Sequence, residues 1–332
     1  MSVRVLQAGL LSTVQDLGRV GHQHDGIPVA GAMDAIALRL ANMLVGNDDG
    51  AAGIEMTLVG ARLQFDAPAL VAITGADVDA RVDATRVPAG RAMHVPAGAT
   101  LALGEAARGC RAYLAIAGGV NVPVVLGSRS TSLRGAFGGL GGRALRRNDV
   151  IPIGVPTALS GRIREGLALD RAPVAIATWG ASSALVPRYS RAPAVRLLAG
   201  EHLEWLTSTS RDALFRAEFR VGAQSDRMGF RLEGTPLELT RPLEILSEAV
   251  AFGTLQLPPG GDPIMLMADR QTTGGYPRIG EVASIDRSLV AQLRPGDRLR
   301  FVPISLDDAQ SLYLAREADL LQARTAIALR HA

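Results

Sequence analysis

The sequence predicts a mainly β protein built from two related halves. Short apolar runs alternate with Gly, Pro and Asp along most of the chain, a spacing typical of a β-barrel or sandwich. With 37 Gly and 18 Pro, the composition favours many turns over long helices. A faint internal repeat suggests the two halves: GIEMTLVG (53–60) and GTLQLPPG (253–260) have Gly at both ends. RRNDVIPI (146–153) and RPGDRLRF (294–301) each place Asp before an alternating strand.

The first half is expected to begin with a strand and turn over 3–14 and to continue mostly as short strands. Turn residues separate these strands from one another. The expected separate strands are GIEMTLVG, ARLQF, ALVAITG, HVPAGATLAL and RAYLAIAGG, while 154–192 has no clear pattern.

Two segments have the pattern of a helix. MDAIALRLANMLVGN (33–47) has Asp34 as a candidate N-cap and Gly46 as its end. The tail from 305 to 330 has Ser305 as a cap and Asp308 at the capping-box position. The apolar residues expected on one face of the tail helix are Leu312, Leu320, Ala323 and Ile327.

The charged residues exclude several classes of chemistry. All 35 basic residues are Arg, so the chain has no phosphate-loop lysine, no Schiff-base lysine and no lysine to carry biotin. Phosphate or carboxylate must be held by Arg, backbone N–H groups or hydroxyls. The formal net charge is only +3 and no basic run occurs, which argues against nucleic acid. With a single Cys, no stretch approaching a membrane span and no secretory signal pattern, we expect a cytoplasmic protein that does not bind membranes.

The stretch MLMADRQTTGGYPRIG (265–280) is the strongest candidate site. An apolar strand is expected to end near Ala268, so that Asp269, Arg270 and Gln271 emerge at its mouth. The turn TTGG (272–275) can present two hydroxyls and backbone N–H groups, because Gly permits positive φ and close approach. The alternative is a hairpin turn that satisfies its own hydrogen bonds.

A second candidate is SDRMGFRLEG (225–234). Arg227 and Arg231 are four residues apart, so in a strand both side chains would lie on one face. Two guanidinium groups there could clamp a carboxylate or phosphate. They could equally pair with Asp226 or Glu233 as a surface network, and both interpretations stay open.

Weaker signals lie in the N-terminal half. His22, His24 and Asp25 suggest a metal, but no third or fourth ligand is evident, so a histidine-bearing loop is the preferred interpretation. Cys110 is expected to be a small core residue. Glu55 either pairs in the core or faces a cleft. The Gly-rich loop 127–143 contains Arg129, Ser130 and Thr131, which could hold an anion.

The chain resembles the KipA / allophanate hydrolase subunit 2 family over about residues 3–303. The resemblance is carried by the candidate segments described above together with LANMLVGN, YLAIAGGV, LGSRST and LRPGDRLRF. The resemblance implies two cyclophilin-like β-barrel domains with a few helices. We expect an N-terminal domain at 1–190, a C-terminal domain at 191–304 and a C-terminal helix at 305–332.

The resemblance also implies an enzyme of several subunits. Bacterial members are C subunits of an ATP-dependent 5-oxoprolinase, which opens the 5-oxoproline lactam to L-glutamate. The implied partners are a KipI-like protein (the B component) and a LamB/YcsF-type protein (the A component). ATP, with Mg²⁺, is therefore expected in the complex. Two alternatives are a biotin-dependent carboxyltransferase acting on urea or a related amide, with biotin carried on another chain, and a non-enzymatic regulator that binds a KipI-like inhibitor.

The resemblance and the residue types together give a set of site residues and no metal ligands. In this hypothesis Arg227 and Arg231 hold a carboxylate or phosphate, and Asp269 and Gln271 orient the amide. Tyr276 closes an anion pocket formed by the turn. Residues assigned to catalysis are Asp269, Gln271, Arg231 and Tyr276. Residues assigned to substrate or anion binding are Ser225, Asp226, Arg227, Gln256, Thr272, Thr273, Gly274, Gly275, Arg129, Gln15, Asp16 and Arg19.

Overall fold

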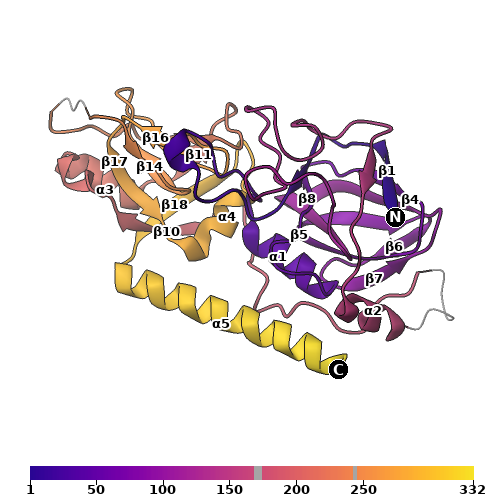
Figure 1. Ribbon diagram of the computed structural model, residues 1–332. Coiled ribbons are helices and arrows are strands. Elements are labelled where there is room, and N and C mark those ends of the chain that lie inside the picture. The colour runs from indigo at the N-terminus through magenta and orange to yellow at the C-terminus, as the bar shows by residue number, and fades with distance from the viewer. Residues whose placement is uncertain (168–173, 242–244) are drawn as a thin grey trace. The chain divides into compact units, whose positions relative to one another are not determined.

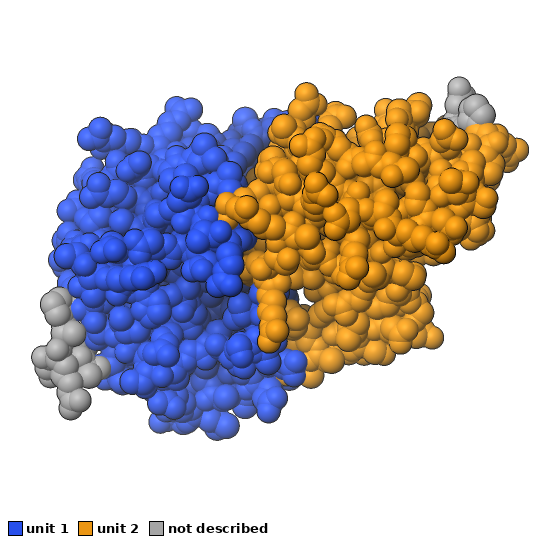
Figure 2. Space-filling view, turned by 180° about the vertical axis from the view of Figure 1, so that it is seen from behind, with its two compact units in different colours: residues 1–19, 30–187, 319–332 blue, residues 20–29, 188–318 orange. Residues whose placement is uncertain are grey.

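The computed structural model describes residues 1–167, 174–241 and 245–332. These residues form two compact units (Figure 2). Unit 1 comprises 1–19, 30–187 and 319–332, and unit 2 comprises 20–29 and 188–318. Two features of these units depart from the expected division at 190 and 304. The short segment 20–29 belongs to unit 2, and the C-terminal helix is divided between the two units.

Unit 1 is built on a nine-stranded sheet (Figure 1). Its main path runs β2-β3-β8-β4-β1-β9, and β5 joins through β8 while also pairing with β6 and β7. The strands of this sheet are β1 Ser2–Gln7, β2 Leu11–Gln15, β3 Gly53–Thr57, β4 Arg62–Phe65, β5 Ala69–Val82, β6 Thr85–Val87, β7 Ala92–Val95, β8 Thr100–Ile116 and β9 Val150–Pro152.

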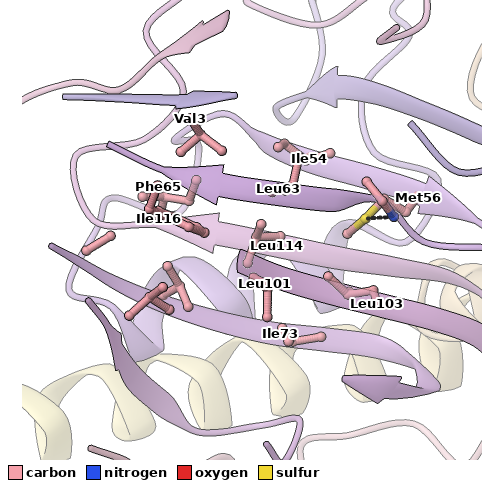
Figure 3. Close-up of a cluster of buried hydrophobic side chains, with 14 of the residues drawn as sticks. Val3, Ile54, Met56, Leu63, Phe65, Ile73, Leu101, Leu103, Leu114 and Ile116 are labelled. Carbon is pink, nitrogen blue, oxygen red and sulfur yellow. Dashed lines mark hydrogen bonds between the residues drawn. The ribbon is translucent and has the colours of Figure 1, made fainter. Parts of the chain in front are cut away.

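The largest hydrophobic cluster of unit 1 lies on one face of this sheet (Figure 3), and smaller clusters pack the helix α1 (Ala35–Leu44) against the other face. Alternate residues of the strands point inward, because successive side chains of a strand lie on opposite faces. In β4, for example, Leu63 and Phe65 are fully buried while Arg62 is exposed. Leu101, Leu103, Leu114 and Ile116 of β8 meet Val3, Ile54, Met56 and Ile73 from neighbouring strands. Cys110 is buried, as expected for a small core residue.

The expectation of separate strands on either side of residue 104 is wrong. β8 runs without a break from Thr100 to Ile116, through Gly104 and Gly109. Gly109 has a positive φ of 75°, and the pairing of β8 with β5 shifts register at three places. The glycines therefore coincide with an irregular, bulged stretch rather than with strand ends.

The helices of unit 1 begin at polar caps. α1 spans Ala35–Leu44, and the Asp34 carboxylate accepts a hydrogen bond from the Ala37 amide, so the predicted cap is confirmed. α2 spans Ala158–Glu165, within the segment that has no clear sequence pattern, and Thr157 caps it through the Ser160 amide. Residues 168–173 of that segment lie outside the described residues.

Unit 2 contains a closed seven-stranded barrel with the order β10-β17-β14-β15-β12-β11-β18. Its interior holds Phe219 and Phe301, whose rings lie 5.8 Å apart. The mainly β class is therefore confirmed. Its strands are β10 Ala194–Ala199, β11 Phe219–Val221, β12 Gly229–Glu233, β14 Thr254–Gln256, β15 Ile264–Leu266, β17 Arg278–Val282 and β18 Arg298–Pro303, and a separate pair is formed by β13 Glu248–Ala249 and β16 Thr273–Gly274.

Helices complete the two units. Ser305 caps the C-terminal helix as predicted: its hydroxyl accepts from the Asp308 amide at 3.1 Å and donates to the Asp308 carboxylate at 2.6 Å, which is the cap of a capping box without its return bond to the Ser305 amide. No helix of the described residues is long and apolar enough to cross a membrane. The helical segments not yet given are α3 Ser208–Arg216, α4 Arg287–Ala291, α5 Leu306–Arg330, and the short 3-10 turns η1 Gln23–Asp25, η3 Leu203–Trp205 and η4 Ser284–Asp286.

Candidate functional site

The two strongest candidate segments meet in unit 2 through a buried ion pair. Arg227 donates from Nε and Nη2 to the two carboxylate oxygens of Asp269, both at 2.9 Å. Only 5% of the Arg227 side chain and 9% of the Asp269 side chain are exposed. The Asp269 amide also donates to the Arg227 carbonyl at 2.8 Å. This bidentate pair fixes the start of the 269–276 loop against the turn before β12.

The expected clamp of Arg227 and Arg231 is wrong. Arg231 lies within β12 and is exposed, whereas Arg227 precedes the strand and is buried. The segment before β12 is a turn, in which the Asp226 carboxylate accepts from the amides of Met228 and Gly229 at 2.7 and 3.3 Å. Because the chain turns here, the strand alternation that would place both guanidinium groups on one face does not apply.

The loop after β15 is tied to a neighbouring segment by backbone hydrogen bonds. Thr273–Gly274 forms β16 and pairs with Glu248–Ala249. The Val250 amide donates to the Thr272 carbonyl at 3.1 Å. Neither Gly274 nor Gly275 has a positive φ, so the expected concavity of glycine-freed amides does not form. The physical reason is that this part of the turn is extended in a two-stranded ladder.

The Gln256 side chain contacts the loop after β15. It is buried at 2% exposure, and Nε2 donates to the Tyr276 carbonyl at 3.4 Å. A Cβ at position 274 would lie 2.4 Å from this Nε2 atom. A side chain at 274 would therefore force the Gln256 amide to shift, so glycine is favoured there by close approach rather than by backbone conformation.

The side chains predicted to contact a ligand are mostly exposed. Gln271, Thr273 and Tyr276 face solvent, Tyr276 with 46% of its surface exposed, and Thr272 is half-buried. That Tyr276 closes an anion pocket stays a prediction. Ser225 is half-buried, and its hydroxyl accepts from the Arg231 amide at 3.2 Å.

Arg270 is a further candidate, to which the sequence pattern assigned no role of its own. Its guanidinium donates to the carbonyls of Val250 at 3.2 Å and Met267 at 3.4 Å. No carboxylate within the described parts of the chain lies within ion-pair distance of it. Burial, followed by the charge of Arg287, lowers the pKa of Arg270 to about 10. A partly desolvated cation whose hydrogen bonds within the described residues go to carbonyls is suited to bind an anion.

The remaining predicted site residues gather in unit 1, where the Gly-rich loop meets the end of β2. The Asp16 carboxylate accepts from the hydroxyls of Ser128 and Ser130 at 2.6 and 2.5 Å and from the Arg129 amide at 2.6 Å. Arg19 is buried and donates to the Ser130 carbonyl at 2.6 Å. These contacts anchor the loop to the strand.

Gln15 and the Arg129 side chain belong to the same group. Gln15 is fully buried and donates to the Thr131 carbonyl at 3.3 Å. Arg129 Nε donates to the Val122 carbonyl at 3.0 Å. The structure thus brings Gln15, Asp16, Arg19 and Arg129 together. Their expected position on one cleft with the 225–231 and 269–276 segments stays a prediction.

The open alternative for Glu55 is decided by contacts, and the histidine-bearing turn can be described beside it. Glu55 pairs in the core, where it accepts from the Tyr113 hydroxyl at 2.7 Å and the Met33 amide at 2.8 Å. Burial, with the charge of Glu55 next, raises the pKa of Tyr113 well above its usual value. His24 lies 3.3 Å from the carboxylate of Asp25 on an exposed turn. No group of three or more potential metal ligands occurs in the described ranges.

Comparisons with known proteins agree on one family. The family model "Carboxyltransferase domain, subdomain A and B" matches residues 25–303. The C subunit of 5-oxoprolinase from Escherichia coli is 39% identical over 92% of this chain and 93% of its own, and that of Haemophilus influenzae is 36% identical over 97% of each. The crystal structure of K. lactis urea amidolyase has a TM-score of 0.87 at 28% identity and covers 97% of this chain, which spans 20% of that protein.

Proposed function

The chain belongs to the family of the carboxyltransferase domain, subdomains A and B, and from this premise we propose that it is the C subunit of an ATP-dependent 5-oxoprolinase. The observation that carries the proposal is the match to two bacterial 5-oxoprolinase C subunits over nearly the whole length of both chains. The urea amidolyase match, by contrast, covers a small part of a much larger protein.

In the proposed reaction, the complex hydrolyses the lactam C–N bond of 5-oxoproline to give L-glutamate and couples this to the hydrolysis of ATP to ADP and phosphate, so that two water molecules are consumed. The proposed partners are a KipI-like protein and a LamB/YcsF-type protein, and ATP with Mg²⁺ is consumed in the complex. ATP activates the lactam by phosphorylating its carbonyl oxygen, because an unactivated amide carbonyl is a poor electrophile. Negative charge then develops at the reacting centre and must be stabilised by preorganised donors.

The chain offers such donors without any lysine. Arg270 is the strongest candidate to hold an anionic group, because it is partly desolvated and its hydrogen-bond acceptors are carbonyls. We assign Arg227 and Asp269 a positioning role, since their ion pair fixes the loop that carries Arg270 and Gln271. Gln271, Tyr276 and Arg231 are exposed and suited to contact a substrate or a partner protein.

A second candidate function is a biotin-dependent carboxyltransferase. It is favoured by the family description and by the high structural similarity to urea amidolyase. Because this chain has no lysine, biotin would have to be carried on another chain.

Reconstitution with partner proteins separates the two candidates. The chain is co-purified with candidate KipI-like and LamB/YcsF-type partners, and glutamate formation from 5-oxoproline is measured with and without ATP. In parallel, the chain is given a biotinylated carrier, its carboxylase, bicarbonate and urea. ATP-dependent glutamate release supports the proposal. Urea carboxylation without glutamate release supports the alternative and contradicts the proposal.

A further inference from the structure

A pocket within unit 2 lies outside the residues assigned so far. It has a volume of about 460 Å³ and is formed by the end of β10, parts of β14 and β17, and the residues leading into α5. This volume is within the range of roughly 300–1,000 Å³ found for small-molecule sites. Its polar lining residues include Glu201, Thr254, Arg278, Glu281 and Ser305.

The pocket adjoins the candidate loop. Ala249 lines the pocket and pairs with Thr273 in the short β13–β16 ladder. Arg278 also lines the pocket and follows the loop by two residues after Tyr276. A ligand in the pocket is therefore next to the segment that carries Arg270.

Charges of both signs are concentrated at this pocket. The Arg278 guanidinium contacts the carboxylates of Glu201 and Glu248, which come from different segments. Glu281 accepts from Arg287 at 3.2 Å. It also raises the pKa of Arg270, so it is within electrostatic range of that residue.

The charged residues that line the pocket are Glu201, Glu281 and Arg278, and each is held in an ion pair, Arg278 with Glu201 and Glu248, and Glu281 with Arg287. A lining that carries both signs does not favour a ligand of one sign. It matches a ligand that carries both signs, because each ligand charge can then meet an opposite partner.

The rest of the lining suits a short hydrocarbon chain. Leu198, Ala251, Ile304 and Leu306 contribute apolar surface between the charged groups. A ligand with a few methylene groups between its charges can contact this surface while its ends meet the charged side chains.

We propose that this pocket binds a small zwitterionic amino acid, with its ammonium group against Glu201 and Glu281 and a carboxylate against Arg278. The charge pattern and the volume define this class of ligand. The identity of the amino acid as L-glutamate rests on the function proposed above, in which glutamate is the product. The pocket then serves as the site that the product occupies after ring opening.

Calorimetry on the full-length chain tests the proposal with matched ligands. L-Glutamate carries both kinds of charge, glutarate lacks the ammonium group and butylamine lacks the carboxylates. We expect glutamate to bind and each analogue to bind at least about tenfold more weakly, because one set of charged side chains is left without a ligand partner. Equal affinity for glutamate and glutarate, or no binding of glutamate, overturns the proposal.

Variants locate the binding site. Glu201→Gln is expected to weaken glutamate binding about tenfold, and its exposed position, with 61% of the side chain accessible, makes misfolding a small concern. Glu281→Gln is expected to act in the same direction, although it also removes the carboxylate partner of Arg287. Glu218→Gln is the matched control, since Glu218 is similarly exposed, pairs with Arg298 and does not line the pocket. Wild-type affinity in both pocket variants, or equal weakening in the control, contradicts the assignment.

This test is separable from the test of the overall function. If glutamate binds at the pocket but the reconstituted complex does not open 5-oxoproline, the proposed function fails and the pocket assignment stands. If the complex turns over but the isolated chain and the complex bind no glutamate, the pocket assignment fails and the proposed function stands.

Discussion

Arg227 and Asp269, separated by 42 residues in the chain, form a bidentate ion pair with two hydrogen bonds of 2.9 Å. Both side chains are nearly buried. The pair joins the turn before β12 to the loop after β15, so the positions of Arg270 and Gln271 depend on it.

Loss of one partner of this pair should destabilise the protein strongly. Asp269→Ala leaves a buried guanidinium without its carboxylate and is expected to lower the free energy of unfolding by about 3–5 kcal/mol. Replacing both residues, as in Arg227→Met with Asp269→Leu, should cost less. Urea denaturation measures both effects. Glu233→Gln, which breaks the exposed pair with Arg220, is the control and should cost no more than about 1 kcal/mol. Equal losses in Asp269→Ala and the control would contradict the structural role.

A side chain at position 274 should displace the Gln256 amide and lower stability. Gly274→Ala places Cβ against Gln256 Nε2, and the overpacking is expected to cost about 1–3 kcal/mol. A second change, Gln256→Ala, removes the obstructing atoms, so the double variant should show a positive coupling in a double-mutant cycle. Gly260→Ala is the matched control because a Cβ there meets no atom within 4 Å, and the change should stay within about 1 kcal/mol. Strict additivity of the two changes would rule out this contact.

The Gly-rich loop of unit 1 should loosen when Asp16 loses its charge. Asp16→Asn weakens the hydrogen bonds from Ser128, Ser130 and the Arg129 amide and is expected to cost about 2 kcal/mol. Hydrogen exchange of residues 127–143 should increase more than exchange in unit 2. Asp77→Asn, which affects an exposed pair with Arg108, is the control. Unchanged protection of the loop in Asp16→Asn would refute the anchoring role.

Stability should fall below about pH 6.5 in part through His94. Burial, followed by the charge of Arg164, lowers the pKa of His94 from its usual value of 6.5. His94 therefore binds a proton more readily in the unfolded chain than in the folded one. The stability associated with neutral His94 is fully present above pH 6.5 and is lost as the pH falls through the folded-state pKa. Urea midpoints at about pH 7.5 and about pH 5.5 measure the loss. His94→Gln should reduce it, whereas His24→Gln, at an exposed turn, should not. An identical pH dependence in wild type and His94→Gln would disprove the role of His94.

Arg270 should matter for turnover more than for folding. Arg270→Met is expected to lower kcat/KM for ATP-dependent glutamate release by about 100-fold, because the preorganised cation is lost. Arg270→Lys should retain part of the activity. Arg298→Gln, on an exposed ion pair of the same unit, is the control. If folded Arg270→Met protein in the complex matches wild type, Arg270 holds no reacting anion.

Features set by neighbouring residues can be predicted from the sequence. The cap of α1 by Asp34 and the cap of α5 by Ser305 are predictable because these hydrogen bonds span three residues. The β-rich class follows from the spacing of short apolar runs. The continuity of β8 does not, since an isolated glycine marks either a turn or a bulge and only the pairing strand distinguishes them.

The site depends on contacts that the sequence does not show. No local pattern predicts that the segments at 225–234 and 265–280 are neighbours, because the Arg227–Asp269 pair joins residues far apart in the chain. Strand alternation misplaced Arg227 because it precedes β12 on a turn. Arg270 received no role from the sequence, because adjacent charged residues in one motif look equivalent until burial and ion pairing separate them.

The most direct test of the proposed function is an omission experiment with the assembled complex. Glutamate release from 5-oxoproline is followed by mass spectrometry in mixtures of the candidate KipI-like and LamB/YcsF-type partners and ATP, with and without this chain. The proposed function predicts release only when this chain and ATP are both present. Folded, co-purifying proteins that release no glutamate, or that release it at the same rate without this chain, would contradict it.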